Sequence, residues 1–278
     1  MNLVTHKFGG ASVRDAKAIR RIGDLLSEQI QSSERVVVVV SAMGKTTNAL
    51  EAVWSETRES ERRILWRSIV KKHLNVAEDL TLSSELKQTL TNRMELCYTA
   101  AEDARNKSMD AAYDSIVAAG ELASTTLVEA WLSQAGMSVG WWDVRDTIHT
   151  SGPHRFARVD EGSLLQAGES LQEFMSQDAQ VVVTQGFIGR HADGSTSTLG
   201  REGSDYSAAL LAVAVGAQSV TIWKDVPGML NADPKLYSDA VTVTQVDHAE
   251  ALELSYYGAS VIHPRTVKPL QHASIPLW

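Results

Sequence analysis

The stretch Leu-Gly-Arg-Glu-Gly-Ser-Asp-Tyr-Ser-Ala-Ala, residues 199–209, joins a loop rich in glycine and hydroxyl side chains to a helix pattern. An apolar strand candidate, Gln180–Thr184, precedes the loop, and an alanine- and leucine-rich pattern from Ser204 to Val215 follows it. A strand, a glycine-containing turn and a helix in this order are typical of α/β folds. The stretch therefore predicts a strand–turn–helix unit.

The same stretch carries residue types that bind anions. Gly200 and Gly203 allow a tight turn, and Ser204 or Asp205 can cap the new helix. Free N–H groups at a helix start attract anions, and Arg201 adds a planar cation suited to a carboxylate or a phosphate. An anion site and a simple capped helix after a flexible loop both fit these residues.

Strand and helix candidates alternate along the rest of the chain. The other strand candidates are Leu3–Phe8, Arg35–Val40, Ser138–Trp142 and Ser219–Trp223. The other helix candidates are Asp15–Ser27, Thr46–Trp54, a stretch punctuated by Gly120 and continued by Glu121–Gln134, Leu164–Met175, Asp247–Tyr256 and Pro264–His272. A continuous valine run, as in the second strand, is typical of a strand covered on both faces. The pattern predicts an α/β fold with a mostly parallel sheet and right-handed crossovers.

Residues 59–107 are charged and contain no glycine or proline, which predicts a helical excursion from the sheet. Within it His73 follows the helical spacing of apolar neighbours, so we expect it in the core. The apolar stretch Ser274–Trp278 resembles the start of another strand, as if the parent protein continued.

Four loops that follow strands are rich in glycine, hydroxyl or charged residues: Gly9–Ser12, Ser41–Asn48, Gly186–Ser204 and Lys224–Lys235. Ligands of open α/β sheets bind beyond the carboxyl ends of the strands. We therefore expect these loops to converge on one site. Lys7, at the end of the first strand, can neutralise a transferring phosphoryl group there, although a plain turn would also contain the two glycines that follow it.

Composition excludes several classes of function. The 278 residues fit one large domain or two small ones. A net charge of −8 without a basic run argues against a nucleic-acid partner. Cys97 is the single cysteine, which excludes internal disulfides. No apolar run approaches the roughly 18 residues that span a bilayer, and no signal peptide is evident, so we expect no membrane partner and a cytoplasmic location.

Several common motifs are missing. The segment Ser-Ala-Met-Gly-Lys-Thr-Thr, residues 41–47, resembles a P-loop but has Val39 where that motif needs glycine. The eight histidines show no ligand spacing with cysteine or carboxylate residues, so no metal site is predicted. The Gly-x-Ser-x-Gly elbow of hydrolases and the Gly-x-Gly-x-x-Gly dinucleotide fingerprint are also absent.

Taken together and in order, the motifs resemble the catalytic domain of the aspartate kinases, within the amino-acid kinase family. The segments that carry the resemblance are KFGGAS (7–12), VSAMGKTTN (40–48), GELAS (120–124), TQGFIG (184–189), LGREGSDY (199–206), DVPG (225–228), ADP (232–234) and YGASVIHP (257–264). Each segment is modest alone, and the ordered set extends over nearly the whole chain.

The resemblance implies a three-layer αβα sandwich with a mostly parallel central sheet, the carbamate kinase-like fold, over residues 1–278. It implies ATP-dependent phosphorylation of the β-carboxylate of L-aspartate, with ATP and Mg²⁺ as cofactors and Mg²⁺ held mainly by the phosphates. It also allows a homodimer. Regulatory ACT domains follow the kinase domain in the family, and this chain ends before they would begin, so we expect no feedback inhibition of this chain alone.

The resemblance also assigns roles to residues. Lys7, Asp205 and Arg201 would be catalytic, with Asp205 orienting the active-site lysine. The residues expected to hold aspartate are Ser41, Thr47, Glu121, Arg201 and Ser204. Those expected to contact ATP are Lys7, Gly9, Gly10, Ser12, Lys224, Asp225, Leu230, Lys235 and Ser260.

The resemblance is incomplete at two positions. Some members of the family have a lysine where this chain has Ser260, and others have a glycine where it has Glu202. Both bear on nucleotide binding more than on the reaction. The chemistry itself suits the residues, because a carboxylate nucleophile is ionised at neutral pH and needs no general base. Two alternatives stay open: a kinase of the same fold acting on another substrate, such as glutamate or acetylglutamate, and a silent module that only binds nucleotide.

Overall fold

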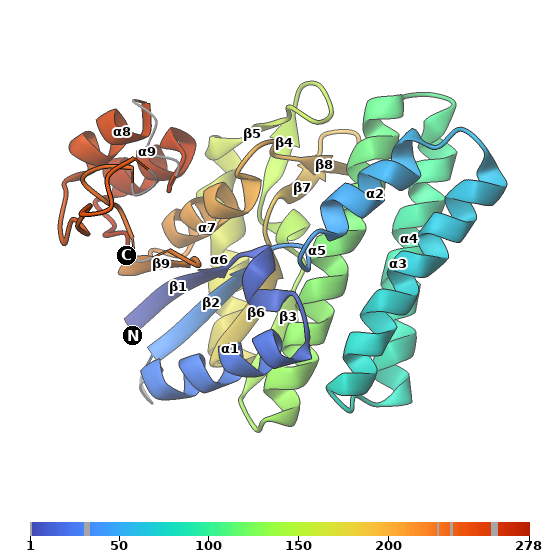
Figure 1. Cartoon of the computed structure of the whole chain (residues 1–278), viewed down its shortest axis with the longest axis horizontal. Coiled ribbons are helices and arrows are strands. Elements are labelled where there is room, and N and C mark those ends of the chain that lie inside the picture. The colour runs from blue at the N-terminus through green and yellow to red at the C-terminus, as the bar shows by residue number, and fades with distance from the viewer. Residues whose placement is uncertain (1, 31–33, 227, 234–235, 257–260) are drawn as a thin grey trace.

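The computed structural model describes residues 2–30, 34–226, 228–233, 236–256 and 261–278. Its centre is a five-stranded sheet in the order β3-β6-β2-β1-β9, with every neighbouring pair parallel (Figure 1). The strands of this sheet are β1 (Asn2–Phe8), β2 (Glu34–Val40), β3 (Val139–Trp142), β6 (Val181–Gln185) and β9 (Ser219–Trp223). The predicted parallel α/β fold is confirmed.

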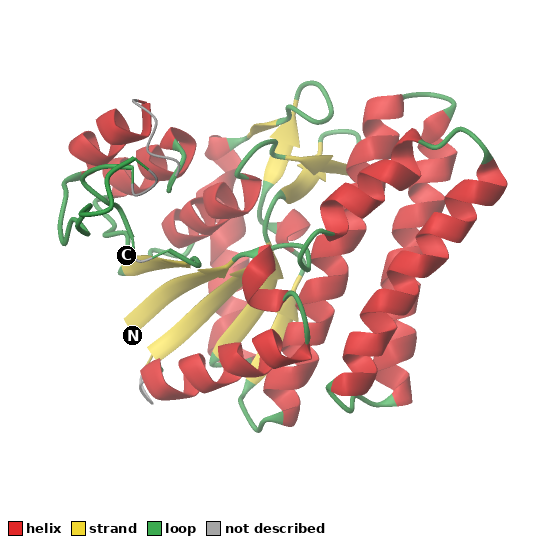
Figure 2. Ribbon diagram, in the orientation of Figure 1, coloured by secondary structure: helices red, strands yellow, loops and turns green. Residues whose placement is uncertain are grey.

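Helices cover both faces of the sheet and make three layers (Figure 2). On one face α7 lies against β1, β2 and β9, with α6 beside it, while α5 lies against β2, β3 and β6 on the other face, together with α1. The α-helices are α1 (Ala16–Gln29), α2 (Thr46–Ser55), α3 (Glu59–Asp79), α4 (Ser84–Arg105), α5 (Met109–Gln134), α6 (Glu161–Asp178), α7 (Gly203–Ala214), α8 (His248–Tyr256) and α9 (Pro264–Ala273). Short 3₁₀ helices are η1 (Gly10–Val13) and η2 (Val144–Asp146).

The expected helical excursion consists of α3 and α4, which form an antiparallel pair. This pair packs against α5 on the side away from the main sheet (Figure 1). His73 is fully buried in α3, and its Nδ1 lies 2.8 Å from the carbonyl oxygen of Ile69. Burial lowers the pKa of His73 to about 4, so the ring is neutral at physiological pH. The histidine therefore belongs to the core, as its spacing predicts.

Helix α5 runs uninterrupted through Gly120, which contradicts the expected punctuation at that glycine. The reason for glycine here is close packing, because a Cβ at Gly120 would lie 2.7 Å from the Cβ of Ala42. Ala42 follows β2, whose residues Val36–Val40 are fully buried between the helical layers. Gly120 thus lets α5 approach the carboxyl end of β2.

A second, four-stranded sheet was not predicted from the sequence. Its order is β5-β4-β7-β8, with strands β4 (His149–Ser151), β5 (Arg158–Val159), β7 (Ile188–His191) and β8 (Thr196–Thr198). The strands are two to four residues long and rich in polar residues, so they lack the apolar alternation that reveals a strand. This sheet lies near the carboxyl ends of the main strands and leads directly into residues 199–209 (Figure 1).

Two features complete the C-terminal part of the chain. Asp247 caps α8, since its Oδ1 accepts the Glu250 N–H at 2.8 Å while the Glu250 side chain accepts the Asp247 N–H. The last residues run parallel to β9, where the Trp278 N–H donates to the Val220 carbonyl at 2.8 Å.

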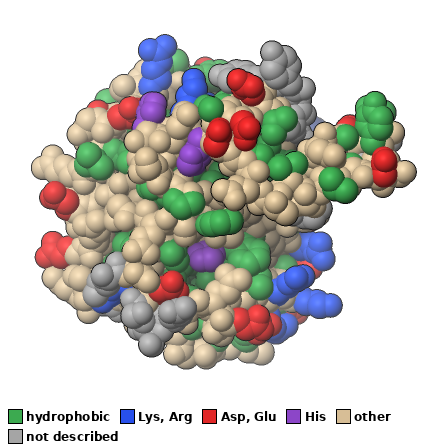
Figure 3. Space-filling view, turned by 90° about the vertical axis from the view of Figure 1, so that its left-hand side faces the viewer, with side chains coloured by type: hydrophobic (Ala, Val, Ile, Leu, Met, Phe, Trp, Pro, Cys, Tyr) green, Lys and Arg blue, Asp and Glu red, His purple; other side chains and the backbone are tan. Residues whose placement is uncertain are grey.

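Figure 3 shows this side of the molecule, on which apolar, acidic and basic side chains are interspersed. Among the described residues, no helix is long and apolar enough to span a membrane.

Candidate active site

A cavity of about 450 Å³ opens where β1 and β2 end and α7 begins. Three of the four loops that were expected to converge contribute to its wall, and Lys224 of the fourth reaches it through an ion pair with Asp205. Its lining residues include Lys7, Gly10, Ser41, Ala42, Gly44, Thr47, Glu121 and residues 200–205. This is the position at which open α/β sheets bind ligands.

Asp205 anchors one end of the cavity through two lysines. Its Oδ1 lies 2.5 Å from Lys7 Nζ, and its Oδ2 lies 2.9 Å from Lys224 Nζ. Burial alone would raise the pKa of Asp205, but the attraction of Lys7 and Lys224 outweighs burial and holds that pKa below its usual value. The carboxylate therefore stays ionised and fixes two ammonium groups at the ends of β1 and β9.

Glu121, on α5, presents a second buried carboxyl group to the cavity. Its Oε1 accepts the Ala42 N–H at 3.2 Å, whereas its Oε2 is buried without a hydrogen-bond partner in the described part of the chain. Burial raises the pKa of Glu121 to about 8, despite the hydrogen bond from Ala42. A cationic group of a ligand placed beside this oxygen would favour its ionised form.

The start of α7 belongs to the stretch 199–209 and forms one wall of the cavity. Ser204 and Asp205 were expected to cap this helix, but the helix begins at Gly203 and both residues lie in its first turn. The Asp205 side chain contacts lysines rather than backbone N–H groups, which explains the difference. The capping position is Glu202, with φ of +54° and no capping hydrogen bond from its side chain.

The helix start approaches β6 closely because Gly186 has no side chain. A Cβ at Gly186 would lie 2.5 Å from the Cβ of Ser204. The exposed Arg201 precedes this turn and lines the cavity together with Ser204. Ser41 and Thr47 line it from the segment after β2. All the residues that were expected to hold aspartate therefore surround one cavity.

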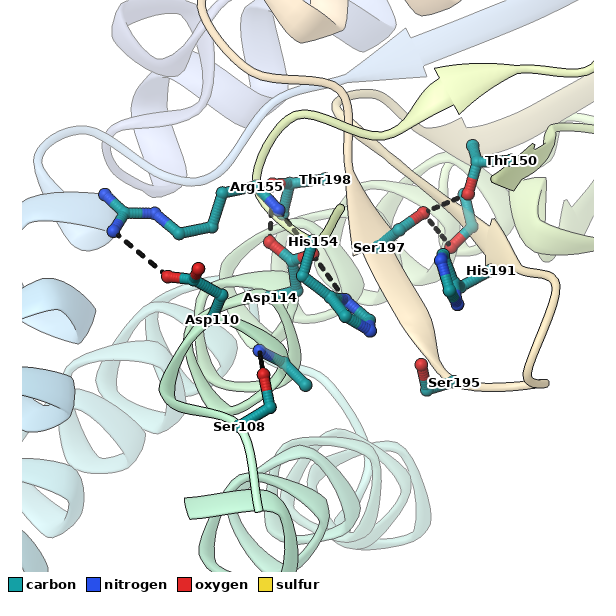
Figure 4. A network of polar contacts seen from close by, with 12 residues as sticks. Ser108, Asp110, Asp114, Thr150, His154, Arg155, His191, Ser195, Ser197 and Thr198 are labelled. Carbon is teal, nitrogen blue, oxygen red and sulfur yellow. Dashed lines mark hydrogen bonds and ion pairs between the residues drawn. The ribbon is translucent and has the colours of Figure 1, made fainter. Parts of the chain in front are cut away.

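Sequence reasoning gave no role to five further lining residues: Tyr113, Arg155 and Phe156, which lie outside the expected loops, and Phe187 and Thr198, which lie within Gly186–Ser204. Two of them are held by the buried Asp114, which accepts the Thr198 hydroxyl at 2.6 Å and the Arg155 N–H at 2.9 Å (Figure 4). The Arg155 guanidinium lies 4.3 Å from the centre of the Tyr113 ring. A buried aspartate inside an apolar helix stretch is the sequence signal that could have indicated this wall.

Fewer of the residues expected to contact ATP lie at the cavity than of those expected to hold aspartate. Of those that the structure describes, Lys7 and Gly10 line the cavity, whereas Gly9, Ser12, Lys224, Asp225 and Leu230 do not. Lys235 and Ser260 lie outside the described residues. Gly9 directly precedes η1, and Leu230 pairs with Thr242 in an isolated bridge. The nucleotide contacts of these residues stay predictions.

The charges at the cavity fit a nucleotide polyphosphate and its metal ion. Lys7, Lys224 and the N-terminus of α7 offer positive potential to phosphate oxygens. Both oxygens of Asp205 are already paired with ammonium groups. The contacts therefore fit Mg²⁺ held by phosphate oxygens rather than by Asp205.

Comparisons with known proteins agree with this geometry. The model of the amino acid kinase family matches residues 2–278. Lysine-sensitive aspartokinase 3 of Escherichia coli is 35% identical over 276 residues, which are 99% of this chain and 61% of that protein. The chloroplastic bifunctional aspartokinase/homoserine dehydrogenase 2 of Zea mays is 32% identical over 285 residues, covering 98% of this chain and 30% of that protein.

The same likeness holds in three dimensions. The crystal structure of E. coli aspartokinase III in complex with aspartate and ADP superposes with a TM-score of 0.89 at 35% identity. The match covers 99% of this chain and 61% of that one, so the chain spans about three fifths of the length of this relative. The family model, the relatives and the fold all agree: the chain belongs to the amino acid kinase family.

Proposed function

We propose that the chain transfers the γ-phosphoryl group of ATP to the β-carboxylate of L-aspartate, giving 4-phospho-L-aspartate and ADP. This reaction is the first step toward lysine, threonine and methionine. The observation that carries the proposal is the buried Glu121 carboxyl in the same cavity as Arg201, because one of its oxygens has no hydrogen-bond partner among the residues that the structure describes. A free amino acid has both the ammonium and the carboxylate group that these two side chains complement. Aspartate and ADP are the ligands of the solved E. coli relative, which supports the choice.

In this proposal Arg201 binds the α-carboxylate of aspartate, and Glu121 binds its ammonium group. Ser41, Thr47 and Ser204 surround the same substrate from the loop after β2 and from α7. The β-carboxylate oxygen attacks the γ-phosphorus, a P–O bond forms, and the bond to ADP breaks with its electron pair leaving on ADP. No proton has to be removed, because the attacking carboxylate is already ionised.

The main difficulty is bringing an anion toward a polyanion. Lys7 stabilises the charge of the transferring group, and Asp205 keeps that lysine in place through the 2.5 Å ion pair. Lys224 brings a second cation to the same carboxylate. Mg²⁺ bound to the phosphates would supply further charge neutralisation. Catalysis then rests on positioning and electrostatics.

A hydroxylamine trap tests the reaction and the substrate together. The chain is incubated with ATP, Mg²⁺ and hydroxylamine, and with L-aspartate, L-glutamate or acetylglutamate in separate reactions. Hydroxamate from aspartate alone is the expected result, since hydroxylamine captures the acyl phosphate. Hydroxamate from glutamate or acetylglutamate instead would assign the chain to another branch of the family.

Lack of product with every substrate, while ATP still binds, would favour the nucleotide-binding module without turnover. ATP binding is measured by calorimetry on the same preparation.

We also infer a cytoplasmic location for the enzyme, and the family resemblance allows a homodimer. The inference on location rests on the lone Cys97, which is buried and unpaired in the fold. Fractionation of cells and light scattering of the purified chain test these two points.

A further inference from the structure

Three potential metal ligands from two separate segments meet at the small sheet. His154 lies in the loop after β4, His191 ends β7, and Asp193 lies in the turn between β7 and β8. One ligand atom of each residue lies within 4.8 Å of those of the other two. The 37-residue gap between His154 and His191 explains why sequence spacing gave no sign of the cluster.

His154 is held so that one ring nitrogen faces the cluster. Its Nδ1 lies 2.9 Å from Oδ2 of the buried Asp114 (Figure 4). Its Nε2 lies 3.7 Å from Asp193 Oδ2. A carboxylate that accepts the proton of one imidazole nitrogen leaves the lone pair on the other. The contact with Asp114 therefore turns a free Nε2 lone pair toward Asp193.

His191 is held in the complementary way. Its Nε2 lies 2.8 Å from the Gly152 carbonyl oxygen, which can only accept a proton, so Nε2 carries the hydrogen. In the neutral ring the lone pair lies on Nδ1, which accepts the Asp193 N–H at 3.4 Å and lies 2.9 Å from Asp193 Oδ1. Metal-binding histidines in proteins have this arrangement, in which the second ring nitrogen donates to a carboxylate or a backbone carbonyl.

We propose that His154, His191 and Asp193 bind one divalent transition-metal ion, with Zn²⁺ as the test ion. Two imidazole nitrogens and one carboxylate oxygen suit Zn²⁺ and its neighbours, whereas Mg²⁺ prefers oxygen ligands alone. The two rings lie 4.5 Å apart between centroids, and Asp193 is exposed on a turn. Small side-chain rotations would bring the three atoms to the roughly 2 Å metal–ligand distances that such ions need. Water would complete the coordination.

The site would be linked to the cavity wall through neighbouring residues. Asp114 contacts His154 and also accepts the N–H of Arg155 at 2.9 Å. Arg155 and Phe156 line the candidate active site. An ion bound to His154 would therefore restrict the loop that carries these two residues.

The test is Zn²⁺ binding to the purified chain, freed of any affinity tag and treated with EDTA. Calorimetry is run with excess Mg²⁺ present, and the visible spectrum of bound Co²⁺ reports on the ligand geometry. The expected result is one Zn²⁺ per chain, with binding weakened at least about tenfold in Asp193→Asn and His191→Ala. Asp114→Asn is expected to weaken binding by about 10- to 100-fold through its contact with His154.

His272→Ala is the matched control, because this exposed histidine lies in the last turn of α9 and should not affect binding. Asp193 is largely exposed, so its variant is expected to fold even if Asp114→Asn does not. No saturable Zn²⁺ binding, or equal affinity in the wild type, Asp193→Asn and His191→Ala, would overturn the proposal. The close His191–Asp193 contact would then be an ordinary ion pair of a protonated histidine. Activity is not the readout, so the outcome is independent of the proposed kinase reaction.

Discussion

The two buried carboxyl groups of the cavity differ in what surrounds them. Asp205 contacts two ammonium groups, at 2.5 and 2.9 Å, and its pKa lies below the usual value. Among the described residues, the Glu121 carboxyl accepts a hydrogen bond only from the Ala42 N–H, and burial raises its pKa to about 8. The Asp205 carboxylate is thus paired with cations of the chain itself, whereas no cation of a described residue pairs with the Glu121 carboxyl.

This difference indicates distinct roles for the two ends. A buried carboxylate with partners of opposite charge fixes those partners in place. A buried carboxyl without one costs stability and is retained where a ligand supplies the missing charge. We therefore expect substitutions at the lysine end to affect the chemical step, and substitutions at the glutamate end to affect substrate binding and the pH dependence of stability.

Replacing Lys7 tests the lysine end and should give the largest effect. Lys7→Met keeps the length of the side chain but removes the charge, so kcat should fall by on the order of 10²–10³-fold. Steady-state kinetics with aspartate and ATP measure this change. The exposed Lys17 of α1 gives the matched control, Lys17→Met, which should leave kcat unchanged. A Lys7→Met enzyme with nearly normal kcat would remove this lysine from the mechanism.

The glutamate end is tested by Glu121→Gln through the pH dependence of unfolding. The pKa of Glu121 is raised from 4.5 to about 8 on folding, so the folded chain retains a proton that the unfolded chain releases. The contribution of this carboxyl to stability is therefore full below about pH 4.5 and is lost as the pH rises toward about 8. The loss is about 1.4 kcal/mol per pH unit within that window.

Glu121→Gln removes this loss, so its free energy of unfolding should rise relative to the wild type between about pH 5 and pH 8. Urea unfolding at several pH values measures the difference, and Glu169→Gln, at an exposed position of α6, is the control. A constant difference between variant and wild type would show that Glu121 does not titrate in this window. The same variant should bind aspartate more weakly, because its amide cannot pair with an ammonium group.

The strands and helices around the main sheet could be predicted because their burial imposes apolar patterns. The valine run of β2 and the alanine-rich α7 are clear examples. The site residues Lys7, Glu121 and Arg201 were assigned through family motifs, and the fold brings them to one cavity. The prediction that Asp205 can cap α7 was wrong, because an ion pair with Lys7 holds its side chain away from the backbone N–H groups.

The small sheet could not be predicted, because its polar strands are stabilised by contacts between distant residues. Thr198, for example, donates to Asp114, which lies 84 residues earlier in the chain. The His154–His191–Asp193 cluster has the same origin, since it depends on the pairing of β4 with β7. Long-range contacts of this kind leave no periodic signal in a single sequence.

Arg201 is an exposed charge at the same cavity as the two buried carboxyl groups. Of the three substitutions, we expect the replacement of Arg201 to have the smallest effect on activity. No hydrogen bond or ion pair joins its guanidinium to another described residue, so the side chain can reorient when a carboxylate arrives. Arg201→Ala should raise the KM for aspartate by about 10- to 100-fold, which corresponds to about 1.5–3 kcal/mol for a hydrogen bond to a charged group. The KM for ATP and the free energy of unfolding should change little, because the side chain is exposed.

Arg158→Ala, at an exposed position of β5, serves as the control in the same kinetics. An unchanged KM for aspartate in Arg201→Ala would contradict the assignment of the α-carboxylate to this residue, and with it the pairing of Arg201 and Glu121 around one amino acid.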